Sequence, residues 1–387
     1  MRAKLVTLAT MLVATTVVVG EASATSSSTT TTTTLAAKPP TALACAARLV
    51  STWSTAKQAD EVVTVSINAL NVGALGPAAR AGFGGVLLFG STAPPSLPAI
   101  LATLQRERRD HVTTLVMTDA EGGGVLRLSN VLAPMPWAQT MGKNLTNVQI
   151  QAAGARLGRS MAAEGLNVDL APVADLDSRA VAPGALDADG FRAFGGDPNV
   201  VAGNVVAFER GLESTGIRGT LKHFPGLGGA NRNTDYGPAH TLSWATLTST
   251  AIVPYRAALQ RTSAMVMVAN ASVPGLTNLP ASIAAPVMTY LRNVLGFQGL
   301  IMTDSLSAGA LSARHLSVAQ ASIDALVAGA DLVLAGNPTS PSAALAQANA
   351  TAKAIARAVA ENVLPAATLA AAASQVVAAR SALSCTS

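Results

Sequence analysis

Charged and polar side chains stand just after the ends of successive apolar segments, and their types can bind a small molecule or move a proton. They are Asp119 and Glu121; Asp169, Asp175 and Asp177; Lys222 and His223; Asn270; and Asp304. A single polar residue in such a place is usually a helix cap. A succession of such groups is hard to explain by capping alone. The pattern therefore indicates an enzyme or a protein that binds a small ligand.

The segments that precede these residues are short, rich in β-branched residues and almost continuously apolar, as strands buried on both faces are. Longer Ala-rich stretches of helical character separate them. The candidate strands are 62–67, 85–89, 113–118, 166–171, 219–223, 264–269, 299–303 and 331–335. This alternation predicts an α/β fold, a single-domain TIM-type (β/α)8 barrel, with a doubly wound open sheet as the alternative. In a barrel the polar groups would all point to the rim at the carboxyl ends of the strands, where barrel active sites lie.

Several longer stretches carry a family resemblance. In chain order they are 84–90 (GGVLLFG), 119–123 (DAEGG) with Arg127, 167–173 (NVDLAPV), 192–195 (RAFG), 222–226 (KHFPG), and 291–292 (LR) leading to 296–304 (GFQGLIMTD). Together they resemble the bacterial β-N-acetylglucosaminidases of glycoside hydrolase family 3. One such stretch is a weak signal, but their order and spacing are those of the family, and KHFPG is the most specific. The resemblance covers essentially the whole chain after the first 41 residues.

The resemblance implies a single-domain barrel that acts as an exo-enzyme and removes terminal N-acetylglucosamine, typically from peptidoglycan-derived cell-wall fragments. Retaining glycosidases use one carboxylate as nucleophile and a second group as acid/base. Asp304 matches the family nucleophile, which would form a covalent glycosyl-enzyme, while a helix N-cap is the structural alternative for it. The residues that match the family's sugar-binding positions are Asp119, Arg127, Arg192, Lys222 and His223. For these, a helix cap or a surface ion pair is the alternative.

The sequence departs from the family in the loop that normally supplies the acid/base. An Asp and, two residues later, a His are usual there, but the positions counted from Lys222 hold Asn233 and Asp235. Leu227 likewise stands where a His usually follows Pro-Gly. We expect Asp235 to act as the acid/base, because burial or a nearby negative charge can raise a carboxyl pKa. His240, from the same Gly-rich and therefore flexible loop, is the alternative.

The N-terminal residues 1–24 have the pattern of an export signal. Two basic residues precede an apolar run over 5–20, and the small residues of 22–24 offer a cleavage site. A retained anchor is the alternative. Residues 25–34 are all Thr or Ser, so we predict a solvated linker over 25–41. The prediction is a protein that is secreted or located in the cell wall or periplasmic space, with no stable membrane span after cleavage.

The folded part is predicted to cover 42–387 and to hold both cysteines, Cys45 and Cys385. Export implies an oxidising compartment, so we predict a disulfide between them, with two free thiols as the alternative. Two Cys and four widely spaced His give no ligand cluster of the zinc type, and no metal or organic cofactor is implied.

Composition narrows the function classes. Half of the residues are hydrophobic and 12% are charged, which argues against overall disorder. The formal net charge is +5, but the basic residues are scattered, so we expect no nucleic-acid partner. Three readings remain: the β-N-acetylglucosaminidase, a β-glucosidase of the same family, and a sugar-binding protein that has lost catalysis with the acid/base pair.

Overall fold

The computed structural model describes residues 41–108, 110, 112–336 and 340–380. The predicted export signal, the linker up to residue 40 and Cys385 lie outside the described residues, so the signal, the linker and the disulfide stay predictions. Cys45 lies in the first helix and is buried. Within the described part of the chain, no helix is both long and apolar enough to cross a bilayer.

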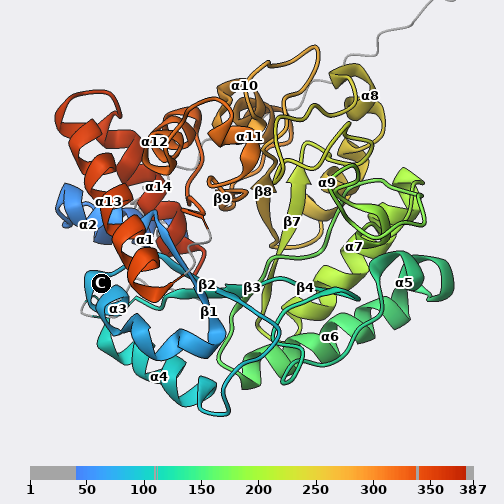
Figure 1. The fold of residues 1–387 in the computed structure, drawn as a ribbon, viewed down its shortest axis with the longest axis horizontal. Helices are drawn as coiled ribbons and strands as arrows, with labels where there is room; N and C mark the ends of the chain where they lie inside the picture. Colours follow the sequence, from blue (N-terminus) through green and yellow to red (C-terminus); the bar gives the residue numbers. More distant parts are fainter. Residues whose placement is uncertain (1–40, 109, 111, 337–339, 381–387) are drawn as a thin grey trace, which may run out of the picture. The chain divides into compact units, whose positions relative to one another are not determined.

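The central element is a parallel sheet whose neighbouring strands follow one another in chain order (Figure 1). Within the described residues the sheet has 7 strands. They are, in sheet order, β1 (Thr64–Asn68), β2 (Gly85–Phe89), β3 (Leu115–Thr118), β6 (Val168–Asp169), β7 (Arg218–Phe224), β8 (Met265–Val268) and β9 (Ile301–Thr303). Nearly all of their residues are buried, as expected of parallel strands covered on both faces. A doubly wound sheet would reverse its strand order, so this alternative does not apply.

The sheet curls, and the eighth predicted segment lies between its two edge strands. Leu332 forms a parallel bridge with Met302 of β9, and Val333 forms one with Val63, the residue before β1. Backbone hydrogen bonds accompany both bridges. The predicted α/β fold is thus confirmed as a curled parallel sheet, in which 331–335 contributes bridges rather than a regular strand.

Helices lie around the sheet and follow most of its strands (Figure 1). The α-helices are α1 (Ala42–Val50), α2 (Thr55–Glu61), α3 (Gly76–Ala81), α4 (Leu97–Glu107), α5 (Ala138–Asn144), α6 (Asn147–Ala163), α7 (Pro198–Glu213), α8 (Trp244–Ser249), α9 (Ile252–Leu259), α10 (Ala285–Thr289), α11 (Gly309–Ser312), α12 (Val318–Ala328), α13 (Pro341–Ala360) and α14 (Ala366–Ala378). The 3-10 helices are η1 (Ala69–Leu75), η2 (Gly190–Arg192) and η3 (Ala281–Ile283), and η4 (Tyr290–Val294) is a π-helix. A small antiparallel pair of strands is formed by β4 (Ala120–Gly122) and β5 (Val125–Leu126). Polar side chains cap several helix starts, as at α6, where Thr146 and Gln149 form a capping box.

Close helix packing holds the strand that carries part of the predicted site. Helices α6 and α7 approach so closely that a Cβ on Gly211 of α7 would lie 2.3 Å from the carbonyl oxygen of Gln151 on α6. Only glycine permits this approach. Helix α7 also contacts β7, because the N–H of Gly219 donates to Oε1 of Glu209 at 3.0 Å. The start of β7 is therefore fixed by a packed helix pair.

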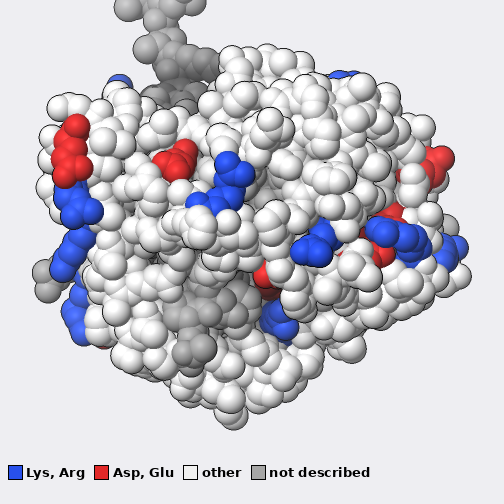
Figure 2. Space-filling model, turned by 45° about the horizontal axis from the view of Figure 1, so that its top comes forward, with Lys and Arg blue, Asp and Glu red and all other residues white. Residues whose placement is uncertain are grey.

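Charged side chains are sparse on the face shown in Figure 2. They stand singly or in small groups of mixed sign on the described part of this face, with no broad patch of one sign. This distribution agrees with the low charged fraction of the sequence, 12%.

Candidate active site

A pocket of about 430 Å³ opens at the carboxyl ends of the strands. Residues from the ends of β2, β3, β7 and β9 and from the loops that follow them line it. Its lining includes Asp119, Glu121, Arg127, Arg192, Lys222, His223, Asn233, Thr234, Asp235, Tyr236, Asp304 and Ser305. The predicted sugar-binding residues therefore share one cavity with Asp304 and Asp235. His240, the alternative acid/base, is not among the lining residues.

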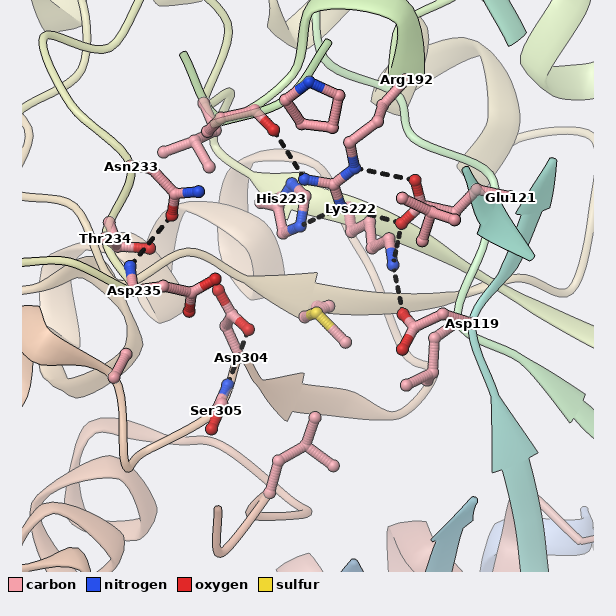
Figure 3. A pocket seen from close by; sticks show the side chains of 18 of the residues that line it. Asp119, Glu121, Arg192, Lys222, His223, Asn233, Thr234, Asp235, Asp304 and Ser305 are labelled. Atoms are coloured by element: carbon pink, nitrogen blue, oxygen red, sulfur yellow. Dashed lines mark hydrogen bonds and ion pairs between the residues drawn. The ribbon is translucent and has the colours of Figure 1, made fainter. Parts of the chain in front are cut away.

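Two cations of the pocket converge on Glu121 (Figure 3). Arg192 binds it through two parallel contacts of 2.8 Å, from Nε and from Nη2. Lys222 Nζ lies 2.6 Å from Oε1 of Glu121 and 2.7 Å from Oδ1 of Asp119. Burial opposes the charge of Glu121, but Arg192 and Lys222 outweigh it and hold the pKa of Glu121 well below its usual range. One wall of the pocket is thus a network of charge-assisted contacts among Asp119, Glu121, Arg192 and Lys222.

Arg127 enters the same pocket from the turn after β5. Its backbone N–H donates to the carbonyl oxygen of Asp119 at 2.9 Å, and its guanidinium lies 5.9 Å from the centre of the Phe89 ring. Its buried Nε has no hydrogen-bond partner among the described residues. The side chain is therefore positioned by the strand ends and keeps donors for a ligand.

His223 contacts the buried carboxylate of Asp175. Nδ1 lies 2.7 Å from Oδ2 of Asp175, which also accepts the backbone N–H of His223 at 2.9 Å. On the other side of the ring, Nε2 lies 3.4 Å from Nη2 of Arg192, a group that can only donate. This geometry assigns the proton to Nδ1 and leaves Nε2 as an acceptor. Burial and the adjacent Arg192 lower the pKa of His223 to about 4, so the ring is neutral at neutral pH.

Asp304 ends β9 and is half-buried at the pocket. Its backbone N–H donates to the carbonyl oxygen of Val268, at 2.9 Å, and its Oδ1 accepts the N–H of Ser305 at 2.6 Å. The next helix, α11, begins later and is preceded by Ala308, so Asp304 caps no helix. Burial raises the pKa of Asp304, and the negative charge of Asp235 raises it further. In Figure 3 the carboxylate of Asp235 points toward that of Asp304.

The loop that carries Asp235 is tied to the segment after β9. The N–H of Gly309 donates to the carbonyl oxygen of Asp235 at 3.1 Å, and that of Ala310 donates to Thr234 at 2.9 Å. The side chain of Asn233 accepts the backbone N–H of Asp235 at 2.9 Å. The Asp235 side chain is exposed and free to reach a bound ligand.

His240 lies on the same loop but outside the pocket lining. The residue is exposed, its Nδ1 lies 3.2 Å from the carbonyl oxygen of Thr241, and its N–H donates to Asn231 at 2.8 Å. A parallel bridge with Ser272 holds this part of the loop. His240 would need a loop rearrangement to reach Asp304, whereas Asp235 already faces it.

The family is decided by a match over most of the chain. Residues 74–379 match the model of the glycosyl hydrolase family 3 N-terminal domain. The chain belongs to glycosyl hydrolase family 3. The resemblance of the motif stretches is therefore confirmed.

Relatives within family 3 are similar along much of the chain. Beta-hexosaminidase LpqI of Mycobacterium tuberculosis is 34% identical over 226 residues, which are 57% of this chain and 57% of that protein. A protein of Arthroderma benhamiae named an uncharacterized secreted glycosyl hydrolase is 31% identical over 262 residues, 63% of this chain and 73% of its own length. The crystal structure of a beta-N-acetylhexosaminidase from Beutenbergia cavernae aligns with a TM-score of 0.73 and 30% identity, over 84% of this chain and 98% of that one. The chain thus matches little more than half the length of LpqI.

Three residues around this family 3 site had no assigned role in the sequence-based prediction. Glu121 follows β3 in the same run as Asp119, so its position was visible but its central place between two cations was not. Asp175 was named only among the polar residues near strand ends, and in the structure it contacts both the backbone N–H and Nδ1 of His223. Asp189 reaches the region from the loop before η2 and had no sequence signal at all.

Proposed function

We propose that this chain is a secreted, exo-acting β-N-acetylhexosaminidase that removes terminal N-acetylglucosamine from peptidoglycan-derived fragments with retention of configuration. The observation that carries the proposal is the position of Asp304, a carboxylate at a strand end that faces a pocket walled by Lys222, Arg192 and Glu121. Charge-assisted hydrogen bonds from such a wall suit sugar hydroxyls. The β-hexosaminidase names of the relatives support the substrate class.

The reaction would run in two steps at Asp304. Its carboxylate attacks the anomeric carbon, the bond to the leaving oxygen breaks, and a covalent glycosyl-enzyme forms. Water then attacks the same carbon, the ester bond to Asp304 breaks, and the sugar is released with its original configuration. Two inversions at one carbon give net retention.

Asp235 is the proposed acid/base of both steps. Its carboxylic acid gives a proton to the leaving oxygen in the first step, and its carboxylate takes one from water in the second. The support is its place in the pocket lining opposite Asp304. His240 remains the alternative donor, through a movement of the loop.

Export and the complete barrel belong to the same proposal. The basic start, the apolar run and the small residues of 22–24 support a secretory signal, as does the secreted relative's name.

The bridges of Leu332 and Val333 support 331–335 as the eighth strand that closes a (β/α)8 barrel. Cys45 and Cys385 would form a disulfide in the exported protein.

The first test is turnover of two chromogenic sugars, the β-N-acetylglucosaminide and the β-glucoside, by the purified mature chain. We expect hydrolysis of the first alone. Hydrolysis of the second alone would move the protein to the β-glucosidases. Sugar binding without hydrolysis of either would make it a non-catalytic binder, the reading suggested by Asn233 and Asp235 in place of the usual pair.

A covalent label tests the nucleophile. A fluorinated N-acetylglucosaminyl substrate that slows the second step should leave one sugar on the peptide that contains Asp304. Asp304→Ala should lose turnover by about 10³-fold or more and still bind N-acetylglucosamine. Retention without any label on Asp304 would instead indicate that the substrate's own acetamido group attacks.

A further inference from the structure

Asp189 is a buried carboxylate without a partner. It precedes η2, its residue is 1% exposed, and neither Oδ1 nor Oδ2 has a hydrogen-bond partner among the described residues. Burying a carboxylate in this way is costly unless a cation, a proton or donors compensate it. Such a group needs a physical explanation.

The surroundings of Asp189 contain two groups that ligate metal ions. One ligand atom from each of Asp175, Asp189 and His223 lies within 4.8 Å of the other two, and all three residues are buried. Two bonds of about 2.0–2.2 Å span at most about 4.4 Å between ligand atoms, so we expect the three side chains to move slightly closer together when an ion binds. These residues come from three different segments of the chain, so their spacing in sequence gave no sign of a cluster.

A second buried polar group without a partner lies against the strand that carries His223. Tyr255 comes from α9 and packs edge-to-face against Phe224, the residue after His223, with ring centres 5.1 Å apart. Its side chain is fully buried, and its hydroxyl has no hydrogen-bond partner in the described part of the chain.

The local charge favours a cation over a water molecule. Among the described residues, neither Asp175 nor Asp189 forms an ion pair with a lysine or arginine. The nearby cations Arg192 and Lys222 are already bound to Glu121. Asp175 accepts the backbone N–H groups of His223 and Leu227, whereas Asp189 beside it has no hydrogen-bond partner among the described residues. One divalent ion would compensate the charge of Asp189.

We propose that Asp175, Asp189 and Nδ1 of His223 bind a divalent transition-metal ion beneath the sugar pocket, and that the ion takes the place of the proton that Nδ1 holds toward Asp175 in the structure. Two carboxylates and one imidazole suit Zn²⁺ or Mn²⁺ better than Ca²⁺, which takes oxygen ligands only. His223 also lines the pocket, so the ion would fix the ring that faces the substrate. The site is separate from the proposed nucleophile and acid/base, and its existence does not depend on the proposed function.

The test is metal uptake by the purified mature chain after treatment with a chelator. Equilibrium dialysis against Zn²⁺ and, separately, Mn²⁺ should give one ion per chain, and the ion should raise the melting temperature. Asp189→Asn should weaken binding by about tenfold or more. Glu209→Gln is the matched control, because Glu209 is equally buried, has an unpartnered Oε2 and lies outside the cluster, so its uptake should equal that of the unchanged chain.

Two results would overturn the proposal. Absence of saturable uptake of both ions would mean that protons or water compensate Asp189. Uptake that Asp189→Asn leaves unchanged would mean an adventitious ion only, for example at exposed His240. If Asp189→Asn fails to fold, the Zn K-edge spectrum of the unchanged chain decides. Oxygen and nitrogen ligands with one imidazole support the site, and a spectrum without imidazole contradicts it.

Discussion

Glu121 connects the two cations that wall the pocket. It accepts both contacts of Arg192 and lies 2.6 Å from Lys222 Nζ, while Asp119 takes the other side of Lys222. Because all of these groups are pre-positioned before a ligand arrives, little order is lost on binding. At the scale of single residues, Glu121 therefore holds both cations of the pocket in position and need not contact the sugar itself.

Glu121→Gln should lower stability by about 3 kcal/mol, because it leaves buried Arg192 and Lys222 short of one negative charge. It should also raise KM more than it lowers kcat, since the two cations lose their fixed positions. Chemical denaturation and steady-state kinetics measure the two effects. Glu209→Gln is the control: burial raises the pKa of Glu209, and an amide oxygen can still accept the N–H of Gly219, so this substitution should change little. Equal losses in both variants would contradict the argument.

Asp235→Asn tests the electrostatic link between the two carboxylates. Asp304 attacks only when ionised, and burial together with the charge of Asp235 raises its pKa, so activity falls as the pH drops below that pKa. Removing the charge lowers the pKa of Asp304. The acid limb of kcat/KM should therefore move to lower pH, as measured with a substrate whose good leaving group needs no proton.

The same variant should lose most activity on poor leaving groups, because those need a proton from Asp235. Asp187→Asn serves as control, since Asp187 pairs with Arg179 and does not line the pocket. An acid limb that stays in place in Asp235→Asn would show that the two carboxylates do not interact.

At the scale of elements, the loop after β7 is positioned by the segment after β9. The carbonyl oxygens of Thr234 and Asp235 accept N–H groups from Ala310 and Gly309 at the start of α11. A Cβ on Gly309 would lie 2.7 Å from the oxygen of Asp235, so the two segments approach as closely as backbone allows. Asp235, the acid/base candidate, thus lies on the loop after β7 and is held in position by the segment after β9.

Gly309→Ala should displace this loop and reduce kcat by about tenfold, because small misplacements of a catalytic group are costly. The loss of stability should stay within about 1–3 kcal/mol, the usual range for overpacking. Gly73→Ala is the matched control, since nothing lies within 4 Å of its added Cβ. Kinetics with unchanged kcat in Gly309→Ala would show that the loop does not depend on this contact.

At the scale of the whole molecule, a buried ion network joins segments from both ends of the described chain. Glu61, in α2, pairs with Arg108 Nη2 at 2.9 Å and with Arg380, which follows α14. Arg380 Nη2 also donates to the carbonyl oxygen of Gly84 at 2.6 Å, just before β2. The C-terminal helix is thereby fixed to the start of the sheet.

Arg380→Met should destabilise the protein by about 3 kcal/mol, because Glu61 stays buried with one cation fewer. Thermal and chemical unfolding measure the loss, and activity at low temperature should persist since the pocket lies elsewhere. Arg357→Met is the control: its pair with Glu361 is exposed and 3.8 Å long, so removing it should cost no more than about 0.5 kcal/mol. Equal losses in the two variants would contradict the role of the network.

The strand elements were predictable because their signal is local. The run 85–89 is strand β2 with the same bounds, and the polar residues after β3, β7 and β9 line one pocket as expected from their positions at strand ends. The bounds of short strands were predicted less well. The predicted strand 166–171 is observed only as Val168–Asp169, because regular backbone pairing with both neighbouring strands forms only there.

The sequence by itself determined the alternation of strands and helices, the family, and which side chains stand at the strand ends, since apolar runs and motif order can be read along the chain. The tertiary structure alone decided how those side chains are paired. Glu121 meets Arg192, Asp175 meets His223, and Asp189 joins them from a loop without any motif. Contacts between segments tens of residues apart depend on how the sheet curls and how the loops pack, and no periodicity in the sequence records either.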